Sequence, residues 1–149
     1  MTDLTLLIVD DDEMHCEMVS DMLEDEYTLY TATTSEDAEV LFKEHKPDII
    51  LLDINMPGKT GIELCRELKE SDQEFSVIFV SGHNSLEERL KAYDAGGDDF
   101  VPKPFEMKEL FAKVHAVAHY QLGKRSLKDQ EAFSRTMAFQ SMAEASQYG

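Results

Sequence analysis

The sequence predicts a three-layer, doubly wound α/β fold of the (βα)5 type, with a five-stranded parallel sheet and a C-terminal helical extension. The first observation is that short apolar runs alternate five times with segments of helical periodicity. The second is the unbroken aliphatic run Ile49–Leu52, which is typical of a strand buried on both faces. Alternation of this kind requires βαβ crossovers with helices on both faces of the sheet. The expected strand order is 2-1-3-4-5, with a ligand site where strands 1 and 3 diverge.

Composition limits the classes of function. The chain has 149 residues, enough for one domain with an appendage, and is 42% hydrophobic and 30% charged. Its formal net charge of −17 argues against binding to nucleic acid or to an anionic membrane. So large an acidic excess also suggests clustered carboxylates, which invite a divalent cation.

Neither cysteines nor targeting segments indicate an oxidising or membrane environment. Cys16 and Cys65 are isolated, fit no zinc spacing, and are expected to be buried and reduced. No basic start with an apolar core precedes the first strand, and no apolar run approaches about 18 residues. These features predict a cytoplasmic protein.

The first half of the chain supplies three strands and two helices. The predicted strands are Leu4–Val9, Tyr27–Ala32 and Ile49–Asp53. A helix is expected over Glu13–Glu24, where the acidic start suits the helix dipole. Its three methionines, at helical spacing, are expected to pack in the core: Met14, Met18 and Met22. Ser35 is the expected N-cap of a second helix that ends before Pro47.

The second half continues the alternation. Three helices are expected in this half. One begins at Gly61, one follows an N-cap at Asn84 or Ser85, and one begins at about Glu106. Short strands are expected at Val77–Val80 and Phe100–Val101. The apolar positions of the three helices are Ile62, Leu64, Cys65 and Leu68, then Leu86, Leu90 and Tyr93, then Leu110, Val114 and Val117.

Acidic, hydroxyl and amino side chains lie at the ends of four of the predicted strands. They are Asp10, Asp11, Asp53, Ser81 and Lys103. Taken alone, Asp53 fits equally well as the start of the turn that follows it. Together, the converging carboxylates would repel one another, and Mg²⁺ with its preference for oxygen ligands is the simplest remedy. A lysine and a serine beside them suit phosphoryl oxygens, so the set predicts phosphoryl transfer to a carboxylate.

Four segments resemble the receiver domain of bacterial two-component response regulators, over about residues 3 to 120. They are Leu6–Asp11, Asp48–Gly58 with Gly61, Val80–Gly82 and Asp98–Phe105, in the family's order and spacing. The resemblance implies a flavodoxin-like fold, with a receiver domain in residues 1–121. Residues 122–149 would then form a helical linker or dimerisation tail that leads to an output domain.

The resemblance also implies the roles of single residues at the acidic end of the sheet. Asp53 would accept a phosphoryl group from a histidine kinase or a phosphotransfer protein. Asp11, Asp53 and the backbone carbonyl of Asn55 would bind Mg²⁺, with Asp10 acting through water. The side chain of Asn55 would matter less there, although with His83 it flanks the path of attacking water.

Further implied roles concern the switch. Ser81 and Lys103 would contact the phosphoryl group, and Phe100 would turn inward when Ser81 moves. A cis peptide before Pro104 would direct Lys103 to the site. The response would alter the surface of the fourth helix, fifth strand and fifth helix, where an output domain, a partner or a second copy would bind. Three departures from the family pattern remove no expected ligand: Gly82, Gly97 and the phenylalanine at position 100.

Two rival functions remain open. An aspartyl-nucleophile phosphatase needs a second acid two residues after Asp53, and Asn55 stands there instead. A phosphorylation-independent scaffold is disfavoured by the intact set of site residues. Other residues that could suggest a function have simpler structural explanations. Asp12 and Glu13 are expected to be acids at the start of a helix, and His115 and His119 to face solvent or a partner without binding a metal. Phe100 could equally be an ordinary core residue.

The last residues are not needed for the fivefold pattern. Gly123 is expected to end or kink the fifth helix, and an amphipathic helix is expected from Ser126. Its apolar positions are Phe133, Met137, Ala138, Met142 and Ala145. The segment is too short and too weakly basic to hold DNA, so a signalling linker or a frayed extension is expected.

Overall fold

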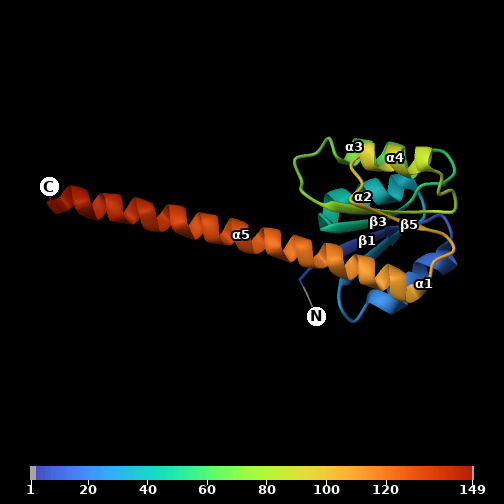
Figure 1. The fold of residues 1–149 in the computed structure, drawn as a ribbon, viewed down its shortest axis with the longest axis horizontal. Coiled ribbons are helices and arrows are strands. Elements are labelled where there is room, and N and C mark those ends of the chain that lie inside the picture. Colours follow the sequence, from blue (N-terminus) through green and yellow to red (C-terminus); the bar gives the residue numbers. More distant parts are fainter. Residues whose placement is uncertain (1–2, 149) are drawn as a thin grey trace. The chain divides into compact units, whose positions relative to one another are not determined.

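The computed structural model describes the backbone of residues 3–148 and the side chains of residues 3–127 (Figure 1). Five parallel strands form one sheet of order β2-β1-β3-β4-β5, as predicted. The strands are β1 Thr5–Val9, β2 Thr28–Ala32, β3 Ile49–Asp53, β4 Ser76–Ser81 and β5 Asp99–Pro102. The helices are α1 Glu13–Leu23, α2 Ser35–His45, α3 Gly61–Leu68, α4 Leu86–Asp94 and α5 Met107–Tyr148. The three-layer, doubly wound fold is therefore confirmed.

The sheet separates two apolar cores. On one face, side chains of α2, α3 and α4 pack against the sheet around Phe42, Leu64 and Ala92. On the other, α1 and the first turns of α5 pack around Val19, Leu23, Leu110, Val114 and Ala118. Figure 1 shows the same division, with α2, α3 and α4 above the sheet and α1 below it. All five residues of β3 are buried, which explains its continuous aliphatic sequence.

Strand register brings the predicted strand ends to one edge of the sheet. Val9 pairs with Leu52, so Asp10 and Asp53 leave adjacent strands at the same level. Asp53 pairs with Val80, and Ser81 pairs with Pro102 directly before Lys103. The acidic, hydroxyl and ammonium groups are thus gathered by the parallel topology itself.

One local prediction for α1 and one for α2 were wrong. Met14 and Met18 are 79% and 52% exposed, because the buried stripe of α1 is carried by Cys16, Val19 and Leu23 instead. The N-cap of α2 is Thr34, whose side chain accepts the Asp37 N–H, and Ser35 is the first helical residue. The error in α1 concerns which of two overlapping apolar stripes faces inward, whereas the error in α2 displaces the cap by one residue.

Other local predictions are confirmed. Asp12 is a helix-start acid, as expected, and is the N-cap of α1: its side chain accepts the N–H groups of Met14 and His15. Ser85, one of two candidates, caps α4. Cys16 and Cys65 are both buried and free.

The predicted apolar face of α4 was also wrong. Leu86, Leu90 and Tyr93 are exposed, and Ala92 is the buried residue of that helix.

Helix α5 does not end at Gly123. Two compact units are present, residues 1–118 and residues 119–149. The predicted apolar stripe from Phe133 to Ala145 lies outside the described side chains. No helix in the described part of the chain has the length and apolar character needed to cross a membrane.

Candidate functional site

Three carboxylates converge at the carboxyl edge of the sheet. Asp10 and Asp11 directly follow β1, and Asp53 is the last residue of β3. One oxygen of each lies within 4.8 Å of the others, and in residues 3–127 no other such group of acids, histidines or cysteines is found. Asp10 and Asp53 are 3% and 5% exposed, whereas Asp11 faces solvent. Two buried acids with an exposed third form a site that is open on one side.

Lys103 joins the two buried acids. Its Nζ lies 3.2 Å from Oδ2 of Asp10 and 3.4 Å from Oδ2 of Asp53. Burial alone would lower the pKa of Lys103, but the two carboxylates outweigh it and raise that pKa. The peptide bond between Lys103 and Pro104 is cis, as the family resemblance implied. The lysine is therefore held as an ammonium ion between its two acidic partners.

The two buried carboxylates differ in their electrostatic environment. Burial raises the pKa of Asp53 to about 6, and Asp10 adds to that effect while Lys103 opposes it. Burial would also raise the pKa of Asp10, but the Asp12 N–H, His15 and Lys103 hold it below its ordinary value. The ionised form of Asp53 is thus poorly compensated by the protein alone, whereas that of Asp10 is well compensated.

This donor set fits a small hard cation. Three carboxylates with oxygens this close repel one another, and the single ammonium of Lys103 does not balance them. Oxygen ligands from one or two carboxylates, with water on an open side, are what Mg²⁺ prefers. The incomplete compensation of Asp53 is consistent with a further positive charge in this site.

Ser81 ends β4 with its side chain fully buried. Its Oγ accepts the Asn55 side-chain N–H at 3.1 Å and the His83 backbone N–H at 3.1 Å. The hydroxyl has one hydrogen, which it can donate to the His83 carbonyl at 3.1 Å or to Oε1 of Glu88 at 3.3 Å. The side chain of Asn55, expected to matter little at the cation site, is therefore engaged in holding Ser81.

The remaining predicted switch residue, Phe100, is 4% exposed and lies in the core beneath α4. Its backbone N–H donates to the side chain of Asp99, and Lys113 of α5 donates to the same carboxylate at 3.3 Å and to the Phe100 carbonyl at 3.0 Å.

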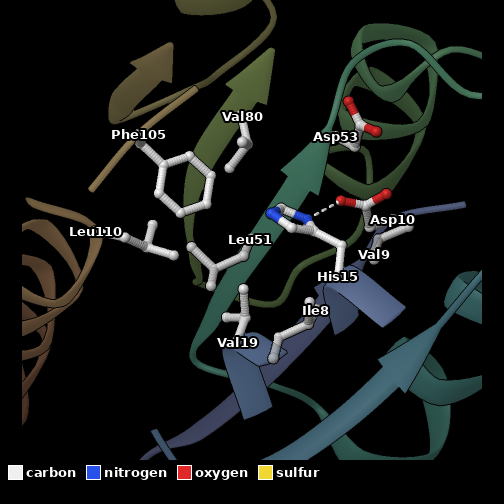
Figure 2. Close-up of a pocket in the computed structure, with 10 residues that line it drawn as sticks. All are labelled: Ile8, Val9, Asp10, His15, Val19, Leu51, Asp53, Val80, Phe105 and Leu110. Carbon is white, nitrogen blue, oxygen red and sulfur yellow. Dashed lines mark hydrogen bonds and ion pairs between the residues drawn. The ribbon is translucent and has the colours of Figure 1, made fainter. Parts of the chain in front are cut away.

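Two residues near the site escaped the sequence analysis. His15 was hidden among the methionines of α1, yet its Nδ1 lies 2.5 Å from Oδ2 of Asp10 (Figure 2). A capping Asp12 implies that residue 15 lies in the first turn, next to the end of β1, and that signal was present in the sequence. Glu88 stands three residues after the Ser85 cap, where a capping-box acid is expected, and contacts Ser81 instead.

The fold and this site define the class: a (βα)5 domain with an acidic site at the carboxyl end of its central strand. The family model of the response regulator receiver domain matches residues 6–115. The chain therefore belongs to this family and is a receiver domain of a two-component response regulator.

Individual relatives agree with this assignment. Response regulator MprA of Mycobacterium ulcerans is 34% identical over 128 residues, which cover 85% of this chain and 53% of that protein. The BeF3-activated receiver domain of DrrB superposes with a TM-score of 0.73 at 33% identity, covering 79% of this chain and 99% of that one. Response regulator DrrB of Thermotoga maritima, an OmpR/PhoB homolog, gives a TM-score of 0.73 at 32% identity, covering 80% and 54%. The chain spans about half the length of the curated relatives it matches.

Proposed function

We propose that Asp53 accepts a phosphoryl group from a phosphohistidine of a histidine kinase or a phosphotransfer protein. A carboxylate oxygen of Asp53 forms the new P–O bond while the P–N bond to the donor imidazole breaks, and its electron pair stays on that nitrogen. The observation that carries the proposal is a buried acid of raised pKa at a strand end, between two further acids and a lysine.

We propose that Asp11, Asp53 and the carbonyl of Asn55 hold Mg²⁺, and that Asp10 acts on it through water. The bound ion would neutralise negative charge on the phosphoryl oxygens. Lys103, already 3.4 Å from Oδ2 of Asp53, would move its hydrogen bond to a phosphoryl oxygen. Support comes from the fit of the donor set, in which Asp53 is the under-compensated member.

We propose that phosphorylation is read out through Ser81 and Phe100. Ser81 would exchange a present partner for a phosphoryl oxygen, and the adjoining α4, β5 and α5 would present an altered surface. The exposed side chains of Leu86, Leu90 and Tyr93 on α4 give that surface an apolar stripe. Its partner would be an output domain or a second copy, reached through the linker of residues 122–149.

A role as a signalling phosphoacceptor, and not as a phosphatase, is favoured by Asn55. Its side-chain amide donates a hydrogen bond to Ser81 and, unlike a carboxyl group, cannot act as a general acid or base in hydrolysis. Steady release of phosphate from an ester substrate would contradict this part of the proposal.

The test is the intact mass after incubation with acetyl phosphate and Mg²⁺. A gain of one phosphoryl group is expected for the wild-type chain and none for Asp53→Asn or after chelation. Asp12→Asn is the matched control, because it removes one nearby charge and asparagine caps a helix as well as aspartate. Absence of modification in the wild-type chain, with the control folded, would favour a phosphorylation-independent scaffold.

A further inference from the structure

His15 is placed at the acidic site by the first turn of α1. Its side chain is 19% exposed, and its Nδ1 lies 2.5 Å from Oδ2 of Asp10. The ring also lies against Phe105, with 5.4 Å between ring centroids and an interplanar angle of 58°. Figure 2 shows the His15 ring with Asp10 on one side and the apolar side chains of Leu51 and Phe105 on the other. The ring is therefore fixed on two sides, by a carboxylate and by an aromatic neighbour.

The contact completes an unusually full set of donors on Asp10. Oδ1 accepts the Asp12 N–H at 3.0 Å, and Oδ2 accepts both His15 Nδ1 and Lys103 Nζ. An ionised carboxylate only accepts, so Nδ1 of His15 carries the shared hydrogen. A carboxylate offers about four lone-pair positions. Three are filled by protein donors, which leaves one for a water molecule.

The two other acids are less occupied. Asp53 accepts the Asn55 N–H at 3.2 Å and Lys103 at 3.4 Å. Within residues 3–127, no hydrogen bond to the exposed Asp11 carboxylate is found. The carboxylates of Asp11 and Asp53 are therefore available as direct ligands of a cation, whereas the oxygens of Asp10 already accept hydrogen bonds from the protein.

We propose that His15 is a positioning residue that keeps Asp10 out of direct contact with the cation and thereby sets the cation affinity of the site. The proposal rests on the proposed cation role of Asp11 and Asp53. By donating to Oδ2, His15 draws negative charge away from the cluster and fixes Asp10 as an acceptor for cation-bound water. The affinity of the site for a divalent cation is thus held lower than three free carboxylates would make it.

The test is calorimetric titration of the full chain with Mg²⁺, comparing wild type, His15→Leu and His15→Asn. Leucine fills similar space and donates no hydrogen bond, so Oδ2 becomes available and Mg²⁺ is expected to bind about 3–10-fold more tightly. Asparagine places a donor N–H close to the position of Nδ1, so its affinity is expected to stay near that of wild type. A merely structural role would have the opposite sign, since a disturbed site binds its cation more weakly.

Each alternative outcome has a distinct meaning. Equal or weaker binding by His15→Leu would overturn the proposal, and so would equal tightening by both variants, which would make ring size responsible instead of the hydrogen bond. Absence of Mg²⁺ binding in wild type and variants alike would overturn the cation role of Asp11 and Asp53 in the proposed function. Binding by wild type without tightening in His15→Leu would overturn only the role of His15.

A second measurement tests the same proposal on the wild-type chain and does not depend on whether His15→Leu folds. The Nδ1 proton of His15, identified as the imidazole signal lost in His15→Asn, is expected to persist in the NMR spectrum when Mg²⁺ saturates the wild-type chain. Its loss on saturation would mean that Asp10 leaves His15 for the cation, which would overturn the proposal.

Discussion

At the scale of single residues, the burial of Asp53 sets a cost on the folded state. Its pKa is about 6 in the fold against 3.8 in the unfolded reference, so the folded state holds the proton more strongly. A group with a raised folded pKa stabilises the fold below its unfolded pKa and loses that contribution as pH rises through the folded value. Ionised Asp53 therefore lowers the free energy of unfolding at neutral pH.

The first prediction is that Asp53→Asn is more stable than wild type when divalent cations are chelated. The gain is expected to be on the order of 1–3 kcal/mol at pH 8 and about 1 kcal/mol smaller at pH 5, because the acid is then largely protonated. Urea unfolding of both proteins at pH 5, 6, 7 and 8 measures it as the difference between their free energies of unfolding at each pH. A gain that does not change with pH, or no gain at pH 8, would contradict the assigned environment.

The second prediction concerns Glu88, whose Oε1 lies 3.3 Å from the Ser81 hydroxyl. We expect Glu88→Ala to bind beryllofluoride, a phosphoryl mimic, about 3-fold more tightly. In this variant the Ser81 hydroxyl has no hydrogen bond to residue 88 that must break before it can bind the mimic. Fluorine NMR titration in Mg²⁺ measures the affinity. Glu88→Gln is the control: it keeps the acceptor oxygen, so an effect as large as that of alanine would trace to lost charge at the start of α4 and not to the hydrogen bond.

At the scale of elements, one departure from the family pattern has a packing reason. Gly97 follows α4, and a Cβ there would lie 2.6 Å from two ring carbons of Phe79 and 3.0 Å from the Ala92 carbonyl oxygen. Phe79 is fully buried in β4 and has no space to withdraw into. The glycine is thus matched to a large side chain on the neighbouring strand.

The third prediction follows from that match. Gly97→Ala is expected to lower the free energy of unfolding by about 1–3 kcal/mol through overpacking. The double variant Gly97→Ala with Phe79→Leu is expected to lose less than the sum of the two single changes, as a urea-unfolding cycle would show. Gly82→Ala is the matched control, since nothing lies within 4 Å of its added Cβ. Strict additivity, or equal losses at positions 82 and 97, would refute the packing argument.

Several helices and strands could be predicted from the sequence, and others could not. The bounds of β3, the start of α3 and the strand order follow from aliphatic runs and βα alternation, because a parallel sheet has few other solutions. The convergence of Asp10, Asp53 and Lys103 follows from the same topology. The buried face of α1 did not, because Met14 and Met18 repeat with helical spacing beside the stripe that packs. His15 and Glu88 were missed because each depends on a side-chain contact between elements, which periodicity does not encode.

At the scale of the whole molecule, α4 presents exposed apolar residues at regular spacing. Leu86, Leu90 and Tyr93 are 65%, 58% and 47% exposed and follow a helical spacing of four and three residues. They form one stripe, and the acids and bases of α4 lie beside it: Glu87, Glu88, Arg89 and Lys91. An apolar stripe flanked by charges of both signs suits a protein partner better than a membrane.

The fourth prediction is that this α4 stripe mediates self-association when the site is occupied. With Mg²⁺ and beryllofluoride the full chain is expected to shift from monomer towards dimer in light scattering coupled to size exclusion, and Leu90→Glu is expected to abolish the shift. A buried leucine side chain contributes about 1.5–3 kcal/mol, so a charge in its place at both copies is enough to dissociate a modest interface. Val40→Glu is the control, because Val40 is similarly exposed, at 53%, on α2. A dimer that forms equally without beryllofluoride would contradict the dependence on site occupancy. A dimer that survives Leu90→Glu while Val40→Glu behaves as wild type would move the interface away from α4 and towards the linker of residues 122–149.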